Sequence, residues 1–157
     1  MTSRYGWGLK STRIAEGVPD TRFERTSVIS TIRLNGEQSP FMFQGTLNSE
    51  VFATYVQNVL APDVNHGDII ILDNLSAHKI SALSPIIEKG ASILFLSPYS
   101  PDFNPIEKAW SKMKSIIRKL KPRTFDDLVV AMKSALDKIT CEDIMGWFKS
   151  CGYVFNV

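Results

Sequence analysis

Two carboxylates stand where a folded chain is expected to bring them together. Asp73 directly follows a run of four apolar residues, 69–72, which Asp68 precedes. The absence of alternation in this run predicts a strand buried on both faces. Glu107 follows 34 positions later, in the first turn of a helix predicted over 105–120. A second apolar run at 92–96 predicts a buried strand beside the first, given a crossover of the usual hand. The carboxyl ends of the two strands would deliver Asp73 and Glu107 to one place, where α/β sheets usually bind ligands.

Two neighbouring carboxylates repel each other unless a cation lies between them. Mg²⁺ is a hard cation that binds through one or two carboxylates and completes its shell with water and the oxygens of a substrate phosphate. A metal held in this way can polarise a phosphodiester and activate the group that attacks it. The pair therefore favours metal-assisted phosphodiester chemistry.

Simpler roles are open for the same residues. Asn104 to Glu107 makes a good helix start, with Asn at the N-cap, Pro at the first position and Glu reaching back to the cap, and these four residues alone favour capping over metal binding. Asp73 could equally form an Asx turn that ends its strand. The nearby polar residues are accessory candidates with simpler roles in turns, caps or hydrogen bonds: Asn74, His78, Asp102 and Asn104.

Positive charge is concentrated next to Glu107. Segment 104–123 holds seven basic residues and a single acid, so it carries +6 while the rest of the chain carries −4, within a net charge of +2. A basic stripe on one helix is the electrostatic footprint of a phosphate-backbone partner, although most charge runs are solvated helix faces. The residues expected to contact a DNA backbone, without reading its sequence, are Lys108, Lys112, Lys114, Arg118 and Lys119.

A β-hairpin is predicted ahead of these elements. As a strand, residues 26–34 would carry three apolar residues and Ser30 on one face and only one apolar residue, Ile29, on the other. The dipeptide Asn35-Gly36 follows, and 40–45 supplies a return strand. The dipeptide predicts a turn in which both residues take positive φ. With the two later strands and the helices between them, the order of elements predicts an α/β layered fold with a C-terminal helical tail.

Capping residues and apolar spacing place the helices. One is expected after an N-cap at Asn48 or Ser49, and another over 77–89 with a kink or restart at Pro85. Two further helices each open with a threonine followed three residues later by an acid, the pattern of a capping box. These two openings are Thr124 with Asp127, and Thr140 with Asp143.

Composition excludes several classes of protein. A chain of 157 residues with 44% hydrophobic and 22% charged residues fits one globular domain. Two cysteines cannot form a disulfide framework or a four-ligand metal site. No apolar run approaches the ~18 residues of a membrane span, and the N-terminus lacks the apolar core of a signal peptide. A cytoplasmic protein with no membrane partner and no small-molecule cofactor is expected.

Two segments resemble the catalytic half of mariner-type DDE transposases, and most closely their bacterial insertion-sequence relatives. The second segment is long and highly specific, and the likeness extends from the Arg4-Tyr5-Gly6-Trp7 region to about Arg123. The segments are Asp73-Asn74-Leu75-Ser76-Ala77-His78 and Leu96-Ser97-Pro98-Tyr99-Ser100-Pro101-Asp102-Phe103-Asn104-Pro105-Ile106-Glu107-Lys108-Ala109-Trp110.

The resemblance implies a ribonuclease-H-like mixed sheet flanked by helices and a site that binds two Mg²⁺ or Mn²⁺ ions. Asp73 would match the second catalytic acid of the family and Glu107 the third, and the two ions would support DNA strand cleavage and strand transfer. The catalytic domain would span 1–123, and 124–157 would be a helical extension packed on it. The helix-turn-helix domain with which the family binds transposon ends has no counterpart in this chain.

The first catalytic acid of the family has no match. In the family it lies on a strand shortly before a block like Arg4-Tyr5-Gly6, whereas the first acid of this chain is Glu16, and Asp20 follows Pro19 in a loop-like stretch that does not fit the motif. The resemblance places the absent strand in mid-sheet, between the hairpin and the strand that ends at Asp73. A truncated or split transposase is therefore expected, impaired alone, with DNA as its partner and an upstream transposase segment or self-association completing it.

Two other classes remain open. A non-catalytic DNA-binding remnant would keep salt-sensitive binding through the basic helix and be indifferent to loss of Asp73 or Glu107. A phosphotransfer or receiver-like domain would also place an acid at a strand end, but it would need neither the segment from Pro98 to Glu107 nor the basic stripe beyond it. This last class therefore ranks lowest.

Overall fold

Four short strands form two pairs in a computed structural model, which describes residues 25–78, 80–98 and 100–155. They are β1 (Thr26–Ile29), β2 (Phe41–Gln44), β3 (Ile69–Leu72) and β4 (Ser92–Phe95). β1 pairs with β2 in antiparallel fashion, and β3 pairs with β4 in parallel. Among the described residues the two pairs form separate sheets.

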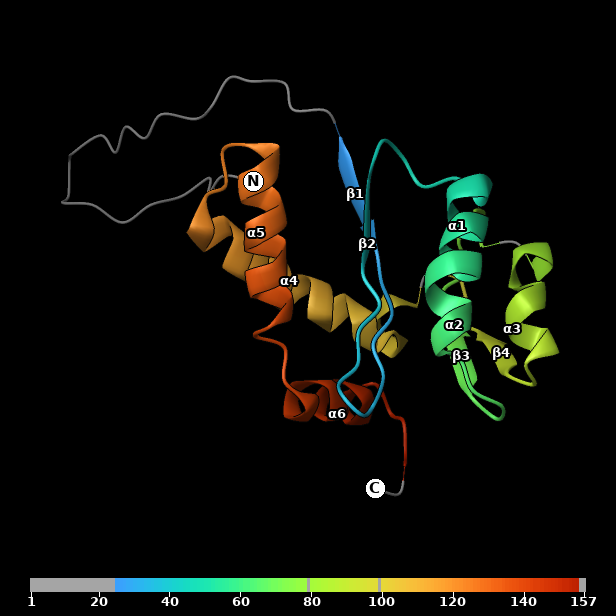
Figure 1. The fold of residues 1–157 in the computed structure, drawn as a ribbon. Helices are drawn as coiled ribbons and strands as arrows, with labels where there is room; N and C mark the ends of the chain where they lie inside the picture. The colour runs from blue at the N-terminus through green and yellow to red at the C-terminus, as the bar shows by residue number, and fades with distance from the viewer. Residues whose placement is uncertain (1–24, 79, 99, 156–157) are drawn as a thin grey trace, which may run out of the picture.

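Helices lie on both sides of the β1–β2 hairpin (Figure 1). On one side, with β3 and β4, are α1 (Ser49–Tyr55), the π-helical turn η1 (Val56–Leu60), α2 (Ala61–Asp63), the 3₁₀ turn η2 (Ile80–Leu83) and α3 (Ser84–Glu88). On the other are α4 (Pro105–Leu120), α5 (Phe125–Leu136) and α6 (Cys141–Ser150). The 3₁₀ turn η3 (Pro101–Phe103) leads into α4.

The helix starts follow the predicted signals closely. Asn48 caps α1 by accepting hydrogen bonds from the backbone of Glu50 and Val51, at 3.0 and 2.8 Å. Pro85 lies in the first turn of α3 and restarts the helix after η2, as expected, although helical structure begins at Ile80 rather than at 77. The prediction of α4 over 105–120 is confirmed at both ends.

The hairpin is confirmed, but its turn differs from the expected one. Only Gly36 has a positive φ, of 94°, and Asn35 does not. The Gly36 N–H donates to the Arg33 carbonyl at 2.9 Å, so an ordinary tight turn precedes a single left-handed glycine. The Asn35 side chain accepts from the Glu37 N–H at 3.0 Å, which stabilises this turn without left-handed backbone at Asn35.

Two hydrophobic clusters flank the hairpin. The first joins α1, η1 and α3 to β3 and β4, around Phe52, Leu83 and Ile86, and Ile29 of β1 packs against it. The second joins α4, α5 and α6 around Met113 and Ile144, with Ile32 from the same arm of the hairpin packed against it. Apolar helix faces therefore cover the hairpin from both sides, the layered α/β arrangement that the sequence predicts.

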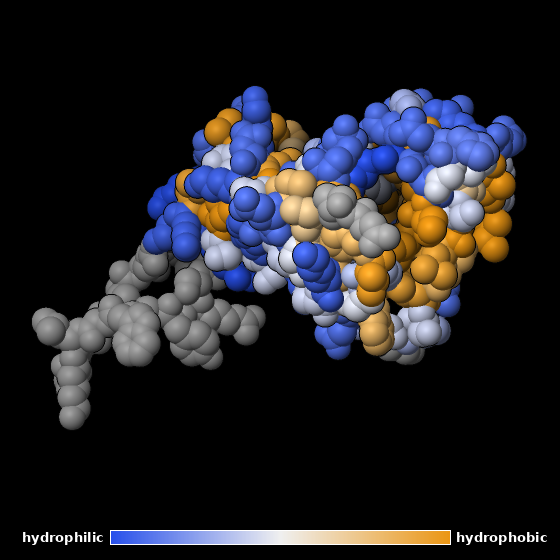
Figure 2. Space-filling view, turned by 90° about the horizontal axis from the view of Figure 1, so that it is seen from below, coloured by the Kyte–Doolittle hydropathy of each residue, from blue (hydrophilic) through white to orange (hydrophobic). Residues whose placement is uncertain are grey.

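The expectation that β3 and β4 are buried on both faces is wrong. Ile69 is 66% exposed and Leu94 is 47% exposed, whereas their neighbours Ile70 and Ile93 pack against the first cluster. Figure 2 shows hydrophobic residues gathered on the part of the molecule that holds these strands. Strands that are apolar at successive positions normally have both faces covered, whereas β3 and β4 each have one face partly exposed.

Candidate active site

Asp73 and Glu107 come from the same edge of the β3–β4 pair. The strands run parallel, and the Leu96 N–H donates to the Leu72 carbonyl at 2.8 Å, so the pairing continues to the last residue before Asp73. The chain leaves β4 at the same edge and reaches the first turn of α4 through η3. Both Asp73 and Glu107 line one cavity of about 790 Å³. The predicted convergence of the two acids is thus compatible with where their elements lead.

His78 holds the Asp73 carboxylate. Its Nδ1 lies 2.7 Å from Oδ1 of Asp73 and 3.3 Å from the Asp73 backbone oxygen, so one ring nitrogen is shared between two oxygens. The histidine side chain is only 10% exposed, and its ring centroid lies 4.4 Å from that of Phe52 in α1. His78 is therefore a packed residue that orients Asp73 from the first hydrophobic cluster.

One oxygen of Asp73 retains capacity for a further ligand. Oδ1 is buried, and its close contact with His78 is too poorly aligned to be a hydrogen bond of normal geometry. The close contact with His78 nevertheless lowers the pKa of Asp73 and outweighs the opposing effect of burial. The Leu75 N–H lowers this pKa further, through the contact that defines an Asx turn. Asp73 is thus a charged carboxylate at neutral pH, and both the Asx turn and His78 orient its side chain.

Glu107 is not used to cap its helix. Asn104 occupies the N-cap position of α4 and Pro105 the first turn, but the Asn104 side chain makes no capping hydrogen bond. The Asn104 N–H, which a capping glutamate would bind, already donates to the Pro101 carbonyl at 3.0 Å. The capping-box interpretation of Asn104 and Glu107 is therefore wrong, and the exposed Glu107 carboxylate is available at the cavity.

The two threonine-acid patterns behave differently from Asn104 with Glu107. Thr124 with Asp127 and Thr140 with Asp143 form complete capping boxes at α5 and α6, as predicted. The same type of sequence pattern thus gives capping at two helix starts and leaves the acid unengaged at the third.

Two of the four accessory candidates line the cavity and two do not. His78 and Asn104 line the cavity together with the two acids. Asn74 and Asp102 are exposed and lie outside its lining, Asn74 in the loop after β3 and Asp102 in η3. Only the first two can therefore contribute to a site inside the cavity.

The donor atoms suit a hard divalent cation. Carboxylate oxygens are the ligands that Mg²⁺ prefers, and Mg²⁺ usually takes only one or two from protein and the remainder from water and phosphate. A buried Asp73 oxygen without a well-aligned hydrogen bond and an unengaged Glu107 carboxylate fit that pattern. Within residues 25–78, 80–98 and 100–155, no group of three or more His, Cys, Asp or Glu side chains could hold a metal. Asp73 and Glu107 are the two predicted acidic ligands among the described residues that line the cavity.

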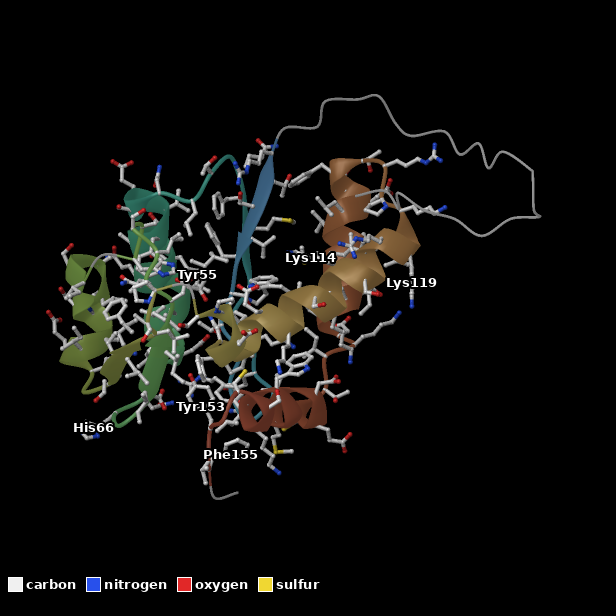
Figure 3. All side chains as sticks on the ribbon, turned by 180° about the vertical axis from the view of Figure 1, so that it is seen from behind. Tyr55, His66, Lys114, Lys119, Tyr153 and Phe155 are labelled. Atoms are coloured by element: carbon white, nitrogen blue, oxygen red, sulfur yellow. The ribbon has the colours of Figure 1, made fainter. Side chains whose placement is uncertain are left out.

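The basic residues of α4 fall into two sets. Lys108 donates to Ser150 Oγ at 2.5 Å and Lys112 forms an ion pair with Asp143, so both are engaged with α6. The hydrogen bond from Lys112 lowers the pKa of Asp143. The remaining predicted contacts are exposed: Lys114, Arg118 and Lys119. Figure 3 shows Lys114 and Lys119 on α4.

Two of the exposed basic residues share a helix face with Glu107. Positions 107, 114 and 118 are spaced by seven and four residues, which returns to nearly the same direction on an α-helix. At ~1.5 Å per residue, Lys114 lies roughly 10 Å and Arg118 roughly 16 Å along the axis from Glu107. A row of positive charge therefore leads away from the cavity on the side that carries the acid.

The end of α6 and the residues after it form part of the cavity wall, which sequence patterns did not reveal. Phe148, Tyr153 and Phe155 line the cavity, and the Tyr153 hydroxyl donates to the Phe103 carbonyl at 2.9 Å. Figure 3 shows Tyr153 and Phe155 near the end of α6. Burial raises the pKa of Tyr153. The contact joins residues 50 positions apart, so no local periodicity could signal it.

Comparison with known proteins identifies one family. The family described as DDE superfamily endonuclease matches residues 1–129, which include β1 to β4, α4 and both acids. No curated protein matches the chain. No helix in the described ranges is long and apolar enough to cross a bilayer. Since the match covers most of the chain, and the described acids and basic helix lie within it, the chain belongs to the DDE superfamily endonuclease family.

Proposed function

We propose that the chain is the catalytic domain of a transposase-type DNA endonuclease in which Asp73 and Glu107 are metal ligands. The observation that carries the proposal is that Glu107, whose carboxylate has no partner among the described residues, lines the same cavity as Asp73 with its buried oxygen. Oδ1 of Asp73 has a close but poorly aligned contact with His78, and a buried carboxylate oxygen without a well-aligned hydrogen bond is costly unless another group satisfies it. A divalent cation held by Asp73 and Glu107 would do so.

The residues of the chain have separate tasks in this proposal. His78 keeps Asp73 charged and oriented, and Glu107 supplies the second carboxylate from the start of α4. Lys114 and Arg118 bind backbone phosphates of the strand that leads to the site, without reading bases. Bound Mg²⁺ or Mn²⁺ supplies the polarisation of the scissile phosphate and the activation of its attacking group.

The family likeness extends the proposal to the rest of the fold and the reaction. The layered α/β arrangement, with an antiparallel hairpin and a parallel pair that ends in an acid, supports a ribonuclease-H-like catalytic domain over 1–123. Residues 124–157 would form a helical extension, since α5 and α6 pack on α4. DNA cleavage and strand transfer by two metal ions would need a third carboxylate, and without it the rate is expected to fall about a thousand-fold, equivalent to about 4 kcal/mol.

Metal binding and plasmid nicking test the proposal together. Mn²⁺ binding is measured by titration calorimetry on the wild-type chain and on Asp73→Asn, Glu107→Gln and Asp102→Asn. The last variant removes an exposed acid outside the cavity and is the matched control. We expect each of the first two substitutions to weaken Mn²⁺ binding at least tenfold and to abolish nicking of supercoiled DNA, with the control unchanged. Equal Mn²⁺ binding by all four proteins would refute the assignment.

A non-catalytic DNA-binding role is the second candidate. It is favoured by the exposed basic residues of α4 and because the described residues hold no group of three or more potential metal ligands. In that case DNA binding would fall with salt but would not respond to divalent ions or to Asp73→Asn. The Mn²⁺ titration therefore separates the two functions.

A further inference from the structure

The peptide group between Phe103 and Asn104 controls what Glu107 can bind. Its N–H is the donor that a capping glutamate would use, and it donates instead to the Pro101 carbonyl at 3.0 Å. Its C=O accepts from the Tyr153 hydroxyl at 2.9 Å. The peptide is trans and planar, so its N–H and C=O point in opposite directions, and the two hydrogen bonds together fix the orientation of the group.

The turn that contains this peptide is exposed to solvent. All three residues of η3 are exposed, and Phe103 is 57% exposed. Within the turn the backbone bonds are local, such as the one from the Phe103 N–H to the Ser100 carbonyl at 3.3 Å. Short 3₁₀ turns have poor hydrogen-bond geometry, and an exposed turn gains little from burial. A hydrogen bond from a distant residue can therefore decide which orientation the peptide takes.

Tyr153 is anchored to the end of α6 (Figure 3). Its N–H donates to the Phe148 carbonyl at 3.1 Å, and the two rings meet edge to face with centroids 5.6 Å apart. Gly152, with a φ of 88°, supplies the left-handed residue with which the chain leaves the helix. Burial raises the pKa of Tyr153, so its hydroxyl is protonated and can donate at neutral pH.

The helix α6 is in turn fixed on α4, the helix that carries Glu107. Ile144 of α6 packs in one cluster with Met113 of α4, and an ion pair joins the same two helices. The contacts close a ring from the start of α4 through η3, Tyr153 and α6 back to α4. Tyr153 therefore holds the peptide ahead of Glu107 from a support that is fixed on the same helix.

We propose that Tyr153 is a positioning residue for Glu107, whose carboxylate it keeps at the cavity by preventing it from capping α4. Without the hydroxyl the Phe103 carbonyl is released, the peptide can turn, and the Asn104 N–H becomes available to Glu107. Segment 104–107 favours this alternative, because it has the residues of a good helix cap. The inference rests on the proposed function, since it concerns the supply of Glu107 to a metal ion.

Hydrogen exchange of the Asn104 amide, measured by NMR on the metal-free chain, tests the contact without any metal. It is measured in a Glu107→Ala background, so that no side chain at this position replaces the lost acceptor. Tyr153→Phe keeps the ring and removes the hydroxyl. Tyr55→Phe is the matched control, because the Tyr55 hydroxyl also donates to a carbonyl at 2.9 Å, that of Ser39, but lies in the first hydrophobic cluster. We expect Tyr153→Phe to speed exchange about fivefold, as loss of one hydrogen bond predicts, and Tyr55→Phe to leave it unchanged.

Titration with Mn²⁺ tests whether Tyr153 acts through Glu107. We expect Tyr153→Phe to weaken Mn²⁺ binding about fivefold in the wild-type and Asp73→Asn backgrounds, and to cause no further loss in the Glu107→Gln background. A merely structural role would weaken binding in all three backgrounds and would overturn the proposal. Unchanged exchange of the Asn104 amide, or unchanged Mn²⁺ affinity of Tyr153→Phe, would overturn it as well. Failure of the proposed function shows separately, as equal Mn²⁺ binding by the wild type, Asp73→Asn and Glu107→Gln.

Discussion

Substitution of Asp143 is expected to strengthen DNA binding by releasing a lysine. Lys112 is held by Asp143 across the α4–α6 contact, with side chains 34% and 27% exposed. Asp143→Asn removes the charge that holds Lys112 but keeps an oxygen that can accept from Thr140 at the start of α6. Exposed ion pairs contribute about 0.5 kcal/mol or less to stability, so the variant is expected to fold.

The magnitude of the effect follows from counterion release. Each phosphate neutralised on duplex DNA changes the slope of log K against log salt by about 0.9. One freed lysine should therefore steepen the slope by about that amount, on top of any uniform effect of removing a negative charge. Glu142→Gln is the matched control, because it removes one negative charge without releasing a lysine. Glu142 is exposed in the same helical turn and pairs with no described lysine.

The slope of log K against log salt is measured by fluorescence anisotropy of a labelled duplex between 50 and 200 mM KCl. Over this range the affinity should change about tenfold to a hundred-fold for a few phosphate contacts. The expected order is a steeper slope for Asp143→Asn than for Glu142→Gln, with the latter close to wild type. If both variants share one slope, Lys112 does not reach DNA when it is freed, and the division of the basic residues into engaged and available sets is refuted.

Three further outcomes are expected. Burial raises the pKa of Tyr55 to about 12, so the folded state binds this proton more tightly than the unfolded state does. The free energy of unfolding should therefore fall by up to about 3 kcal/mol as the pH rises from 10 toward 12. Tyr55→Phe should abolish that fall, as measured by urea titrations. Burial raises the pKa of Asp68, but hydrogen bonds from the Asn65 N–H and from Arg33 outweigh this effect and lower it. The stability that this group contributes is present above the usual pKa near 3.8 and is lost as the pH falls below it. Asp68→Asn should therefore weaken the fall in unfolding free energy at acid pH. Lys114→Ala should reduce the salt slope of duplex binding by about 0.9 without changing Mn²⁺ affinity.

Local signals predicted the elements well because they depend on neighbouring residues. The apolar stripe from Ile106 to Leu120 defined α4, and the glycine at position 36 supplied the one left-handed turn residue that the hairpin needs. Capping boxes at Thr124 and Thr140 are likewise satisfied within four residues. Each of these features could form with little help from the rest of the chain.

Features that depend on distant contacts could not be read in the same way. The partner of Lys112 lies 31 positions away, and the exposure of Ile69 and Leu94 reflects which elements cover β3 and β4. An apolar run indicates that a strand seeks burial on both faces, but it does not say whether the covering residues are supplied. The exposure of Ile69 and Leu94 is therefore a property of the assembled fold.

The freedom of Glu107 depends on the segment that precedes it. At Thr124 and Thr140 the backbone enters the helix with ψ near 169° and 161°, and each acid binds the N–H of its own cap. At Asn104 the ψ is 105°, and the N–H is taken by the Pro101 carbonyl of the 3₁₀ turn. The turn thus removes the donor that would have drawn the glutamate back to the cap. A proline-rich loop before α4 can therefore act on the chemistry of the site while lying outside it, by deciding whether an acid in the first helical turn serves the helix or the cavity.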